Sequence, residues 1–281
     1  MATANPLERI FSVDYKSKIQ PIISVCIWGK GLENLNRPEG VTIDDTTGDI
    51  YVADSGNNSV KVFDDNGKII FKFGDEEGEG KMYGPIGLAI YRERILISQS
   101  SNSILNYQVN GNFISRIGKQ GGGELEFDHP SGLTFDDSNG DIYICDSSNV
   151  RIQILSKELT YKSHFGQDTL EYPVDVKLSK EFIYILDQSN PCLHLYNYDF
   201  ILQKSFISRG YGLQLNYPWF FYIDTSNNIV ITDIGSISIF NSQYELIHEV
   251  SLSDPSGVTL DNRGRVIVVC EAFEKLCLHV L

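Results

Sequence analysis

Residues 37–74 read RPEGVTIDDTTGDIYVADSGNNSVKVFDDNGKIIFKFG, and this stretch decides the fold. It contains short apolar runs, each bounded by Gly, Asp or Asn, and these residues supply the turn conformations that β-branched residues disfavour. Apolar runs of this length, separated by turn residues, predict four antiparallel strands.

The same phrase recurs along the chain, each time starting at a proline that usually has a glycine two residues later. Neighbouring prolines lie 37 to 47 residues apart, which is about the length of one four-stranded propeller blade. The copies begin at Pro38, Pro85, Pro130, Pro173, Pro218 and Pro255. The sequence therefore predicts an all-β chain, folded as a six-bladed β-propeller of four-stranded antiparallel blades.

The two ends of the chain complement each other. The last copy begins at Pro255 and reaches Leu281 without a fourth strand, whereas residues 21–29, PIISVCIWG, end in the aromatic–glycine pair that closes other copies. We expect the N-terminal strand to complete the last blade and close the ring, which removes an open sheet edge. This gives one propeller domain over residues 21–281, preceded by a tail at 1–20.

These copies resemble the NHL repeats of six-bladed β-propellers, as found in the NHL domain of tripartite-motif (TRIM-NHL) proteins. The resemblance lies in Pro-x-Gly-apolar at 38–41, YVADSGNN at 51–58, Val-x-Val-Phe at 60–63 and the closing Phe-Gly at 73–74. It implies a protein-interaction module that binds substrates or partners in ubiquitin-related pathways. The sequence contains no RING or B-box array of Cys and His, so we expect recognition rather than ligase chemistry.

The charge balance argues against polyanionic partners. Acidic residues number 37 against 23 basic ones, giving a formal charge of -14. Long-range electrostatics then repel nucleic acid and anionic membranes, so RNA binding, which some NHL propellers perform, is the alternative rather than the first hypothesis. With no apolar run long enough to span a bilayer and no secretory signal, we expect a cytoplasmic monomer without membrane contact.

Candidate binding residues follow from the propeller geometry. The inter-blade connections and the loops after each second strand are expected to share one face, so residues next to the repeat prolines ring the mouth of the central channel. The mixture of charge, imidazole and aromatic rings there suits recognition of a protein. The candidates of this kind are Arg37, His129, Tyr172, Tyr217 and Trp219.

Blades four and five depart from the repeat. Asp175 replaces the glycine and Lys177 follows on the same face of the strand, so the two are expected to pair, either as a structural ion pair or as a ligand-contacting pair. Phe220 takes the glycine slot of the fifth copy, where core filling is favoured over an exposed aromatic platform.

The recurrent aspartates Asp54, Asp146, Asp187 and Asp233 are expected to hold turns rather than to act in catalysis. The innermost strands offer mainly Val, Leu, Ile, Thr and Gly. We therefore expect no catalytic residues, no metal and no cofactor. A propeller hydrolase or lyase is the less favoured alternative.

Overall fold

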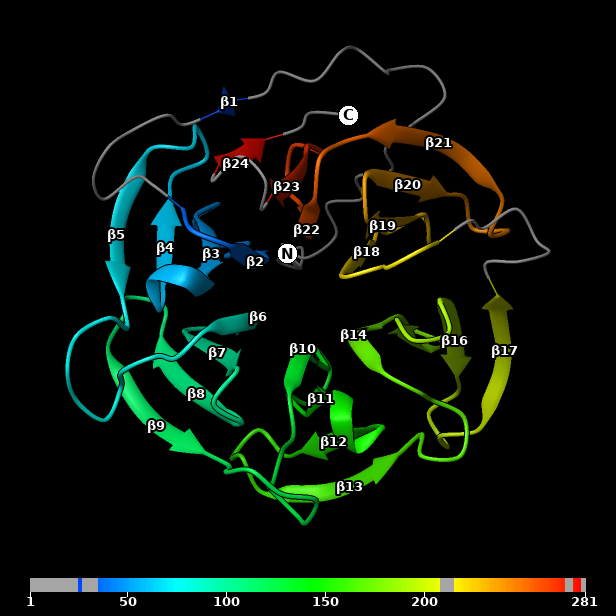
Figure 1. Ribbon diagram of the computed structural model, residues 1–281, viewed down its shortest axis with the longest axis horizontal. Coiled ribbons are helices and arrows are strands. Elements are labelled where there is room, and N and C mark those ends of the chain that lie inside the picture. The colour runs from blue at the N-terminus through cyan, green and yellow to red at the C-terminus, as the bar shows by residue number, and fades with distance from the viewer. Residues whose placement is uncertain (1–24, 27–34, 208–214, 271–274, 279–281) are drawn as a thin grey trace, which may run out of the picture.

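The structure is a computed structural model and describes residues 25–26, 35–207, 215–270 and 275–278. Its strands form six four-stranded antiparallel sheets that are arranged as blades around a central axis (Figure 1). Five of these sheets consist of four consecutive strands, and the sixth combines strands from the two ends of the chain. The all-β propeller and the four-stranded antiparallel blades are confirmed.

Each blade runs from an innermost to an outermost strand. Blade 1 comprises β2 (Pro38–Ile43), β3 (Ile50–Asp54), β4 (Ser59–Phe63) and β5 (Ile69–Phe73). Blade 2 comprises β6 (Pro85–Tyr91), β7 (Arg94–Gln99), β8 (Ser103–Gln108) and β9 (Phe113–Ile117). Blade 3 comprises β10 (Pro130–Phe135), β11 (Ile142–Asp146), β12 (Arg151–Leu155) and β13 (Tyr161–Phe165).

The second half of the ring repeats this plan, with shorter strands in blades 5 and 6. Blade 4 comprises β14 (Pro173–Leu178), β15 (Ile183–Asp187), β16 (Cys192–Tyr196) and β17 (Leu202–Ile207). Blade 5 comprises β18 (Phe221–Ile223), β19 (Ile229–Asp233), β20 (Ser236–Phe240) and β21 (Leu246–Ser251). Blade 6 comprises β22 (Pro255–Leu260), β23 (Val266–Cys270), β24 (Lys275–Leu278) and β1 (Val25–Cys26).

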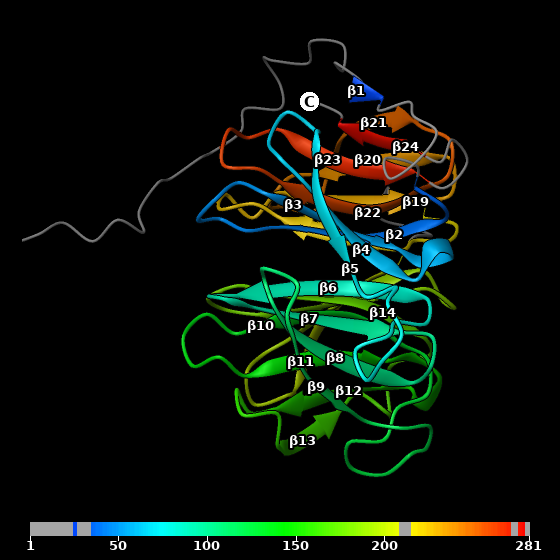
Figure 2. The ribbon, with the colours of Figure 1, turned by 90° about the vertical axis from the view of Figure 1, so that its left-hand side faces the viewer.

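Strand β1 pairs antiparallel with β24 in the register Val25↔Leu278 and Cys26↔Cys277. The two strands lie side by side in both views of the ring (Figures 1 and 2). This is the pairing that the expected ring closure requires. That these two residue pairs hold the ring closed remains a prediction, and so does the assignment of residues 1–20, which lie outside the described part of the chain.

The hydrophobic core is divided into clusters that lie between neighbouring blades. One cluster joins blades 1 and 2 through residues such as Val62 and Ile97, and another joins blade 6 to blade 1 through Ile267 and Val52. A sheet that is apolar on both faces needs a neighbour on each side, which is why the strands β3, β7, β11, β15, β19 and β23 read as continuous apolar runs. Each blade is stabilised by both neighbours.

The repeat glycine allows the innermost strands to approach one another. A Cβ atom at Gly257 would lie 2.4 Å from the Glu39 carbonyl oxygen of blade 1, and one at Gly87 would lie 2.4 Å from the Ser131 carbonyl oxygen. Both distances are shorter than van der Waals contact, so any side chain there would push neighbouring blades apart. Phe220 occupies this slot in blade 5, is 6% exposed and packs in the core between blades 5 and 6, which confirms core filling.

Side-chain hydroxyls connect several neighbouring blades near the central axis. Ser98 Oγ donates to the Ser131 carbonyl (2.5 Å), and Ser131 Oγ donates to the Val174 carbonyl (2.8 Å). Ser256 Oγ donates to the Pro38 carbonyl (2.6 Å), so the last described innermost strand is bonded to the first. Hydrogen bonds of this kind offset the cost of desolvating the buried hydroxyls and link one blade to the next.

In the described part of the chain the only helical segments are two three-residue 3-10 turns, η1 (Ser55–Asn57) and η2 (Ser147–Asn149). Neither approaches the length or the apolar character of a segment that crosses a bilayer.

Candidate functional site

The recurrent aspartate fixes the connection that enters each blade. Asp54, at the end of β3, accepts a hydrogen bond from the Asn36 backbone amide (2.6 Å) and forms an ion pair with Lys61 (2.7 Å). It also accepts from the Asn57 side chain in its own turn (2.8 Å). The expected turn-holding role is therefore correct but incomplete, because the same carboxylate also anchors the inter-blade connection next to Pro38.

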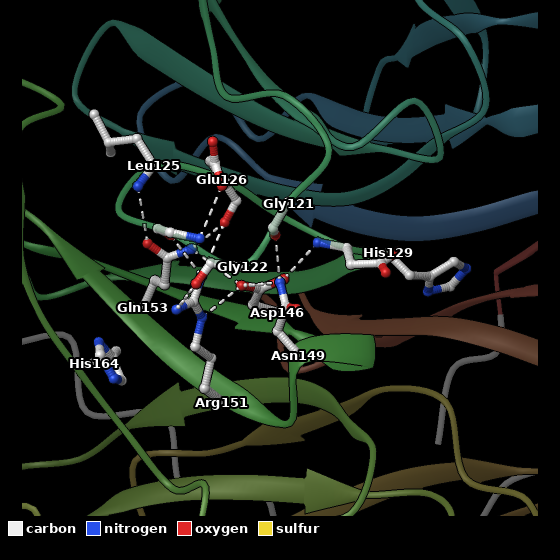
Figure 3. A network of polar contacts seen from close by, with 12 residues as sticks. Gly121, Gly122, Leu125, Glu126, His129, Asp146, Asn149, Arg151, Gln153 and His164 are labelled. Carbon is white, nitrogen blue, oxygen red and sulfur yellow. Dashed lines mark hydrogen bonds and ion pairs between the residues drawn. The ribbon is translucent and has the colours of Figure 1, made fainter.

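Blade 3 has the most extensive version of this anchor (Figure 3). Asp146 is fully buried and accepts from the Asp128 backbone amide (2.7 Å) and from Arg151 Nε (2.7 Å). Arg151 and Gln153, both on β12, point towards the preceding glycine-rich connection, where they donate to the carbonyls of Gly122, Gly123 and Glu126. The loop is thereby held by charge-assisted hydrogen bonds in addition to the core packing of Leu125 and Phe127.

In blades 4 and 5 the same anchor positions two tyrosines of the rim. Asp187 accepts from the backbone amides of Glu171 (2.7 Å) and Tyr172 (3.0 Å). Asp233 accepts from the backbone amide of Tyr217 (2.5 Å) and from that of Ile234 (2.8 Å). The inter-blade connections and the loops after the second strands are therefore bonded to each other, as expected, and they form one face, which we call the mouth face.

A polar pocket of about 420 Å³ opens on the mouth face over blades 1 to 3. Its lining comes from three inter-blade connections, from innermost strands and from the loops that follow β3 and β7. The residues are Arg37, Glu39, Ser55, Gly56, Asn58, Tyr83, Gly84, Ile86, Ser100 and His129. Two of the predicted site residues, Arg37 and His129, thus line a single pocket although they lie in different blades.

His129 connects this pocket to blade 4. Its Nδ1 atom lies 3.0 Å from the Tyr172 hydroxyl, and the two ring centroids are 5.9 Å apart. Partial burial raises the pKa of Tyr172, and the hydrogen bond from Ser148 opposes this shift. The phenol is therefore neutral at physiological pH and available as a hydrogen-bonding group.

The rim of blade 5 presents an apolar surface that we call the blade-5 platform, formed by Tyr217, Trp219 and Ile234. The rings of Tyr217 and Trp219 meet edge to face with centroids 5.2 Å apart. Tyr217 is 46% exposed and Ile234 is 55% exposed, whereas Trp219 is half-buried and packs against the core between blades 5 and 6. Exposed aromatic side chains that are held rigid are typical anchors for protein partners.

Asp175 and Lys177 form the expected pair, but the carboxylate does not reach the surface. Asp175 is fully buried, and both of its oxygens lie 2.8 Å from Lys177 Nζ. It also accepts from the Phe221 backbone amide of blade 5 (3.1 Å). Burial raises the pKa of Asp175, and the Lys177 ammonium opposes the shift. The arrangement matches the structural ion pair rather than a group presented to a ligand.

The predicted residues therefore fall into two groups. Arg37, His129, Tyr172, Tyr217 and Trp219 lie on the mouth face and are linked in space, while Asp175 and Lys177 lie at the boundary between blades 4 and 5. Tyr83 (46% exposed) and Ile234 were missed. Tyr83 stands two residues before its proline and Ile234 directly after an anchoring aspartate, so both positions carry a signal that the repeat could have supplied.

The fold is a β-propeller, and two of its blades match NHL repeats. The family model described as "NHL repeat" matches residues 35–63 and 127–155, which contain the first three strands of blades 1 and 3. Protein brain tumor of Drosophila melanogaster is 27% identical over 135 residues, a match that covers 46% of this chain and 12% of that protein. The chain thus matches about an eighth of the length of this relative.

Solved structures of similar shape include enzymes. A streptogramin B lyase superposes with a TM-score of 0.66 at 14% identity and covers 88% of this chain and 94% of its own. The gluconolactonase XC5397 from Xanthomonas campestris superposes with a TM-score of 0.70 at 13% identity, covering 89% and 87%. At such low identity these similarities support the propeller fold and carry no information about activity.

Proposed function

We propose that this propeller is a non-catalytic recognition module that binds a protein partner through its mouth face. One observation carries the proposal: the pocket, the His129–Tyr172 pair and the blade-5 platform lie on one face. Interfaces are enriched in Tyr, Trp and Arg, which are the residue types found there. The resemblance to TRIM-NHL propellers supports a role as a partner-binding element in ubiquitin-related pathways.

The backbone of the rim supports this role because it is held in place before any partner arrives. The anchoring carboxylates of Asp187 and Asp233 bind the amides of Tyr172 and Tyr217 directly. Aromatic anchors on a preorganised backbone lose little conformational entropy when they bind.

Affinity capture with a matched pair of triple variants tests the proposal. Tyr172→Ala, Tyr217→Ala and Trp219→Ala together remove the aromatic groups of the mouth face. Ile70→Ala, Ile114→Ala and Leu246→Ala remove a similar number of exposed apolar side chains (42–50% exposed) from the outermost strands β5, β9 and β21. We expect partners to be lost from the first variant and retained by the second. Equal capture by the wild type and both variants contradicts the proposal.

RNA binding is separated from protein binding by a titration. Filter binding with structured and single-stranded RNA at low salt is expected to show only weak association, because the net charge of -14 opposes phosphate binding. Tight, salt-sensitive binding would reverse this ranking. Stoichiometric calcium or zinc in the purified protein would instead favour a propeller enzyme.

A further inference from the structure

The charge around the blade-5 platform differs from that of the pocket. The described rim segments of blades 4 to 6, residues 167–172, 188–191, 215–219, 234–235 and 252–254, contain neither Lys nor Arg. They contain the exposed carboxylates Asp168, Glu171 and Asp254. The remaining rim aspartates, Asp187 and Asp233, are buried and already accept backbone amides. The described rim segments of this half of the mouth face are therefore apolar and anionic.

The backbone places the exposed carboxylates on either side of the platform. Glu171 directly precedes Tyr172 in blade 4, and Asp254 occupies in blade 6 the position that Tyr217 occupies in blade 5. Blade 5 lies between blades 4 and 6 in the ring (Figure 1). Each blade that neighbours Tyr217 and Trp219 thus carries an exposed carboxylate at its rim.

An arginine side chain fits this combination best. Its planar guanidinium stacks on aromatic faces and forms charge-assisted hydrogen bonds with carboxylates in the same plane. The apolar stem of the side chain can cover Ile234, which is 55% exposed. An anionic or purely apolar group would leave Glu171 and Asp254 without complementary charge.

We propose, resting on the protein-binding function above, that the mouth face binds an extended segment of a partner protein whose arginine lies on the blade-5 platform between Glu171 and Asp254. From the platform the segment continues over Tyr172 and His129 to the polar pocket, where hydroxyl and amide groups such as Ser55 and Asn58 face the occupant. The net charge of -14 adds a long-range attraction for such a basic segment.

A library of random dodecamer peptides displayed on phage tests this inference with the full chain as bait. We expect arginine to be enriched among the selected peptides, and a fluorescein-labelled copy of the best one to bind in a polarisation assay. Replacing its arginine by citrulline, the neutral isostere, should weaken binding about tenfold, since it removes the charge but keeps the shape. The double variant E171Q/D254N should cause a similar loss and reduce the salt dependence of binding.

The ring of Tyr217 gives an internal control. Tyr217→Phe keeps the aromatic face and should retain binding, whereas Tyr217→Leu keeps apolar area without the ring and should weaken it about threefold to tenfold. Because Tyr217 is half exposed, neither change disturbs the core.

The outcomes separate this inference from the proposed function. Acidic or apolar peptides that are selected and then lost with the Tyr172, Tyr217 and Trp219 triple variant would overturn the arginine inference and leave the protein-binding function standing. Selection of no peptide, or of peptides that bind E171Q/D254N as tightly as the wild type, also contradicts the inference. Unchanged capture by the triple variant would refute both.

Discussion

Asp175 shows how one substitution in a repeat is accommodated. A glycine at this slot lets neighbouring strands touch, whereas Asp175 places a carboxylate there that Lys177 neutralises and that the Phe221 amide bonds. Removing one member of a buried ion pair leaves an uncompensated charge, which costs more than the pair itself contributes.

The first prediction concerns Lys177→Met. At pH 7 this change should destabilise the protein by about 3 kcal/mol, because the buried carboxylate loses its counter-charge. Burial already raises the pKa of Asp175 in the folded state, and loss of the ammonium raises it further. The folded chain then binds a proton that the unfolded chain releases, so stability is retained below the unfolded pKa and falls as pH rises through the folded pKa. Urea unfolding of wild type and variant at pH 4 and pH 7 measures the difference.

Lys157→Met is the matched control, since Lys157 pairs with Glu158 (3.8 Å) and the two side chains are 60% and 62% exposed. An exposed pair of this kind contributes about 0–1 kcal/mol at either pH. If Lys177→Met lost the same stability at pH 4 as at pH 7, the buried carboxylate would not be the cause.

At the scale of elements, the structure depends on side chains that hold the inter-blade connections. The connection before blade 3 is bonded by Asp146, Arg151 and Gln153, which come from two adjacent strands, β11 and β12. In blade 2 the equivalent position is Gln99, whose Oε1 accepts the Tyr83 amide at 2.9 Å without an ion pair. The hydrogen bond to the connection is therefore common to blades 2 and 3, while the ion pair is present in blade 3, as it is in blade 1, and is replaced by a neutral amide in blade 2.

The second prediction compares Asp146→Ala with Asp146→Asn. Alanine leaves the buried Arg151 unpaired and should cost about 3–5 kcal/mol. Asparagine keeps an acceptor for the Asp128 amide, as Gln99 does in blade 2, and should cost less. Hydrogen exchange at Leu125, Phe127 and Asp128 is expected to accelerate in the alanine variant. Unchanged exchange there would show that Arg151 and Gln153 hold the connection without the carboxylate.

Much of the element order could be predicted because each strand is encoded locally. The repeat prolines mark the first residue of β2, β6, β10, β14 and β22, and only β18 begins later, at Phe221, because Phe220 fills the glycine slot. The rim was harder to predict. Left-handed backbone conformations occur at Arg37, His129 and Asp254 (φ 50°, 54° and 46°). Such conformations are uncommon for residues other than glycine, and they change the direction in which the side chain leaves the backbone.

The pocket could not be predicted from the sequence, because its lining comes from loops of separate blades. The distances between these loops depend on how the blades pack, and no single copy of the repeat contains that information. Tyr83 was missed because the candidates were the residues directly before the repeat prolines, and the residue before Pro85 is Gly84. The anchoring role of Asp54 was half predicted, because its bond to Asn36 spans 18 residues.

At the scale of the whole molecule, the described innermost strands form a continuous circle through contacts such as Ser256 with Pro38. The outermost position of blade 6 depends on the two residue pairs between β1 and β24. A circle that is closed at its centre, and at its edge by the predicted role of β1, should unfold as a single cooperative unit.

The third prediction uses two truncations to separate tail from blade. Deletion of residues 1–20 should leave the midpoint of thermal unfolding unchanged, as expected for a tail. Deletion of residues 1–26 removes β1 and should lower the midpoint by several degrees, because β24 then loses its outer partner and becomes an exposed edge strand. Calorimetry measures both midpoints. Equal midpoints for the two truncations would mean that β1 does not close the ring.

The innermost boundary between blades 4 and 5 contains a buried carboxylate. Hydroxyls of Ser98, Ser131 and Ser256 bridge innermost strands elsewhere in the ring, whereas here the Asp175 carboxylate accepts the Phe221 amide. In the Lys177→Met variant an upward pH jump would ionise Asp175 and weaken the contacts that it makes at this boundary. Fluorescent probes on either side would then report how a propeller begins to come apart, from a known position and at a known time.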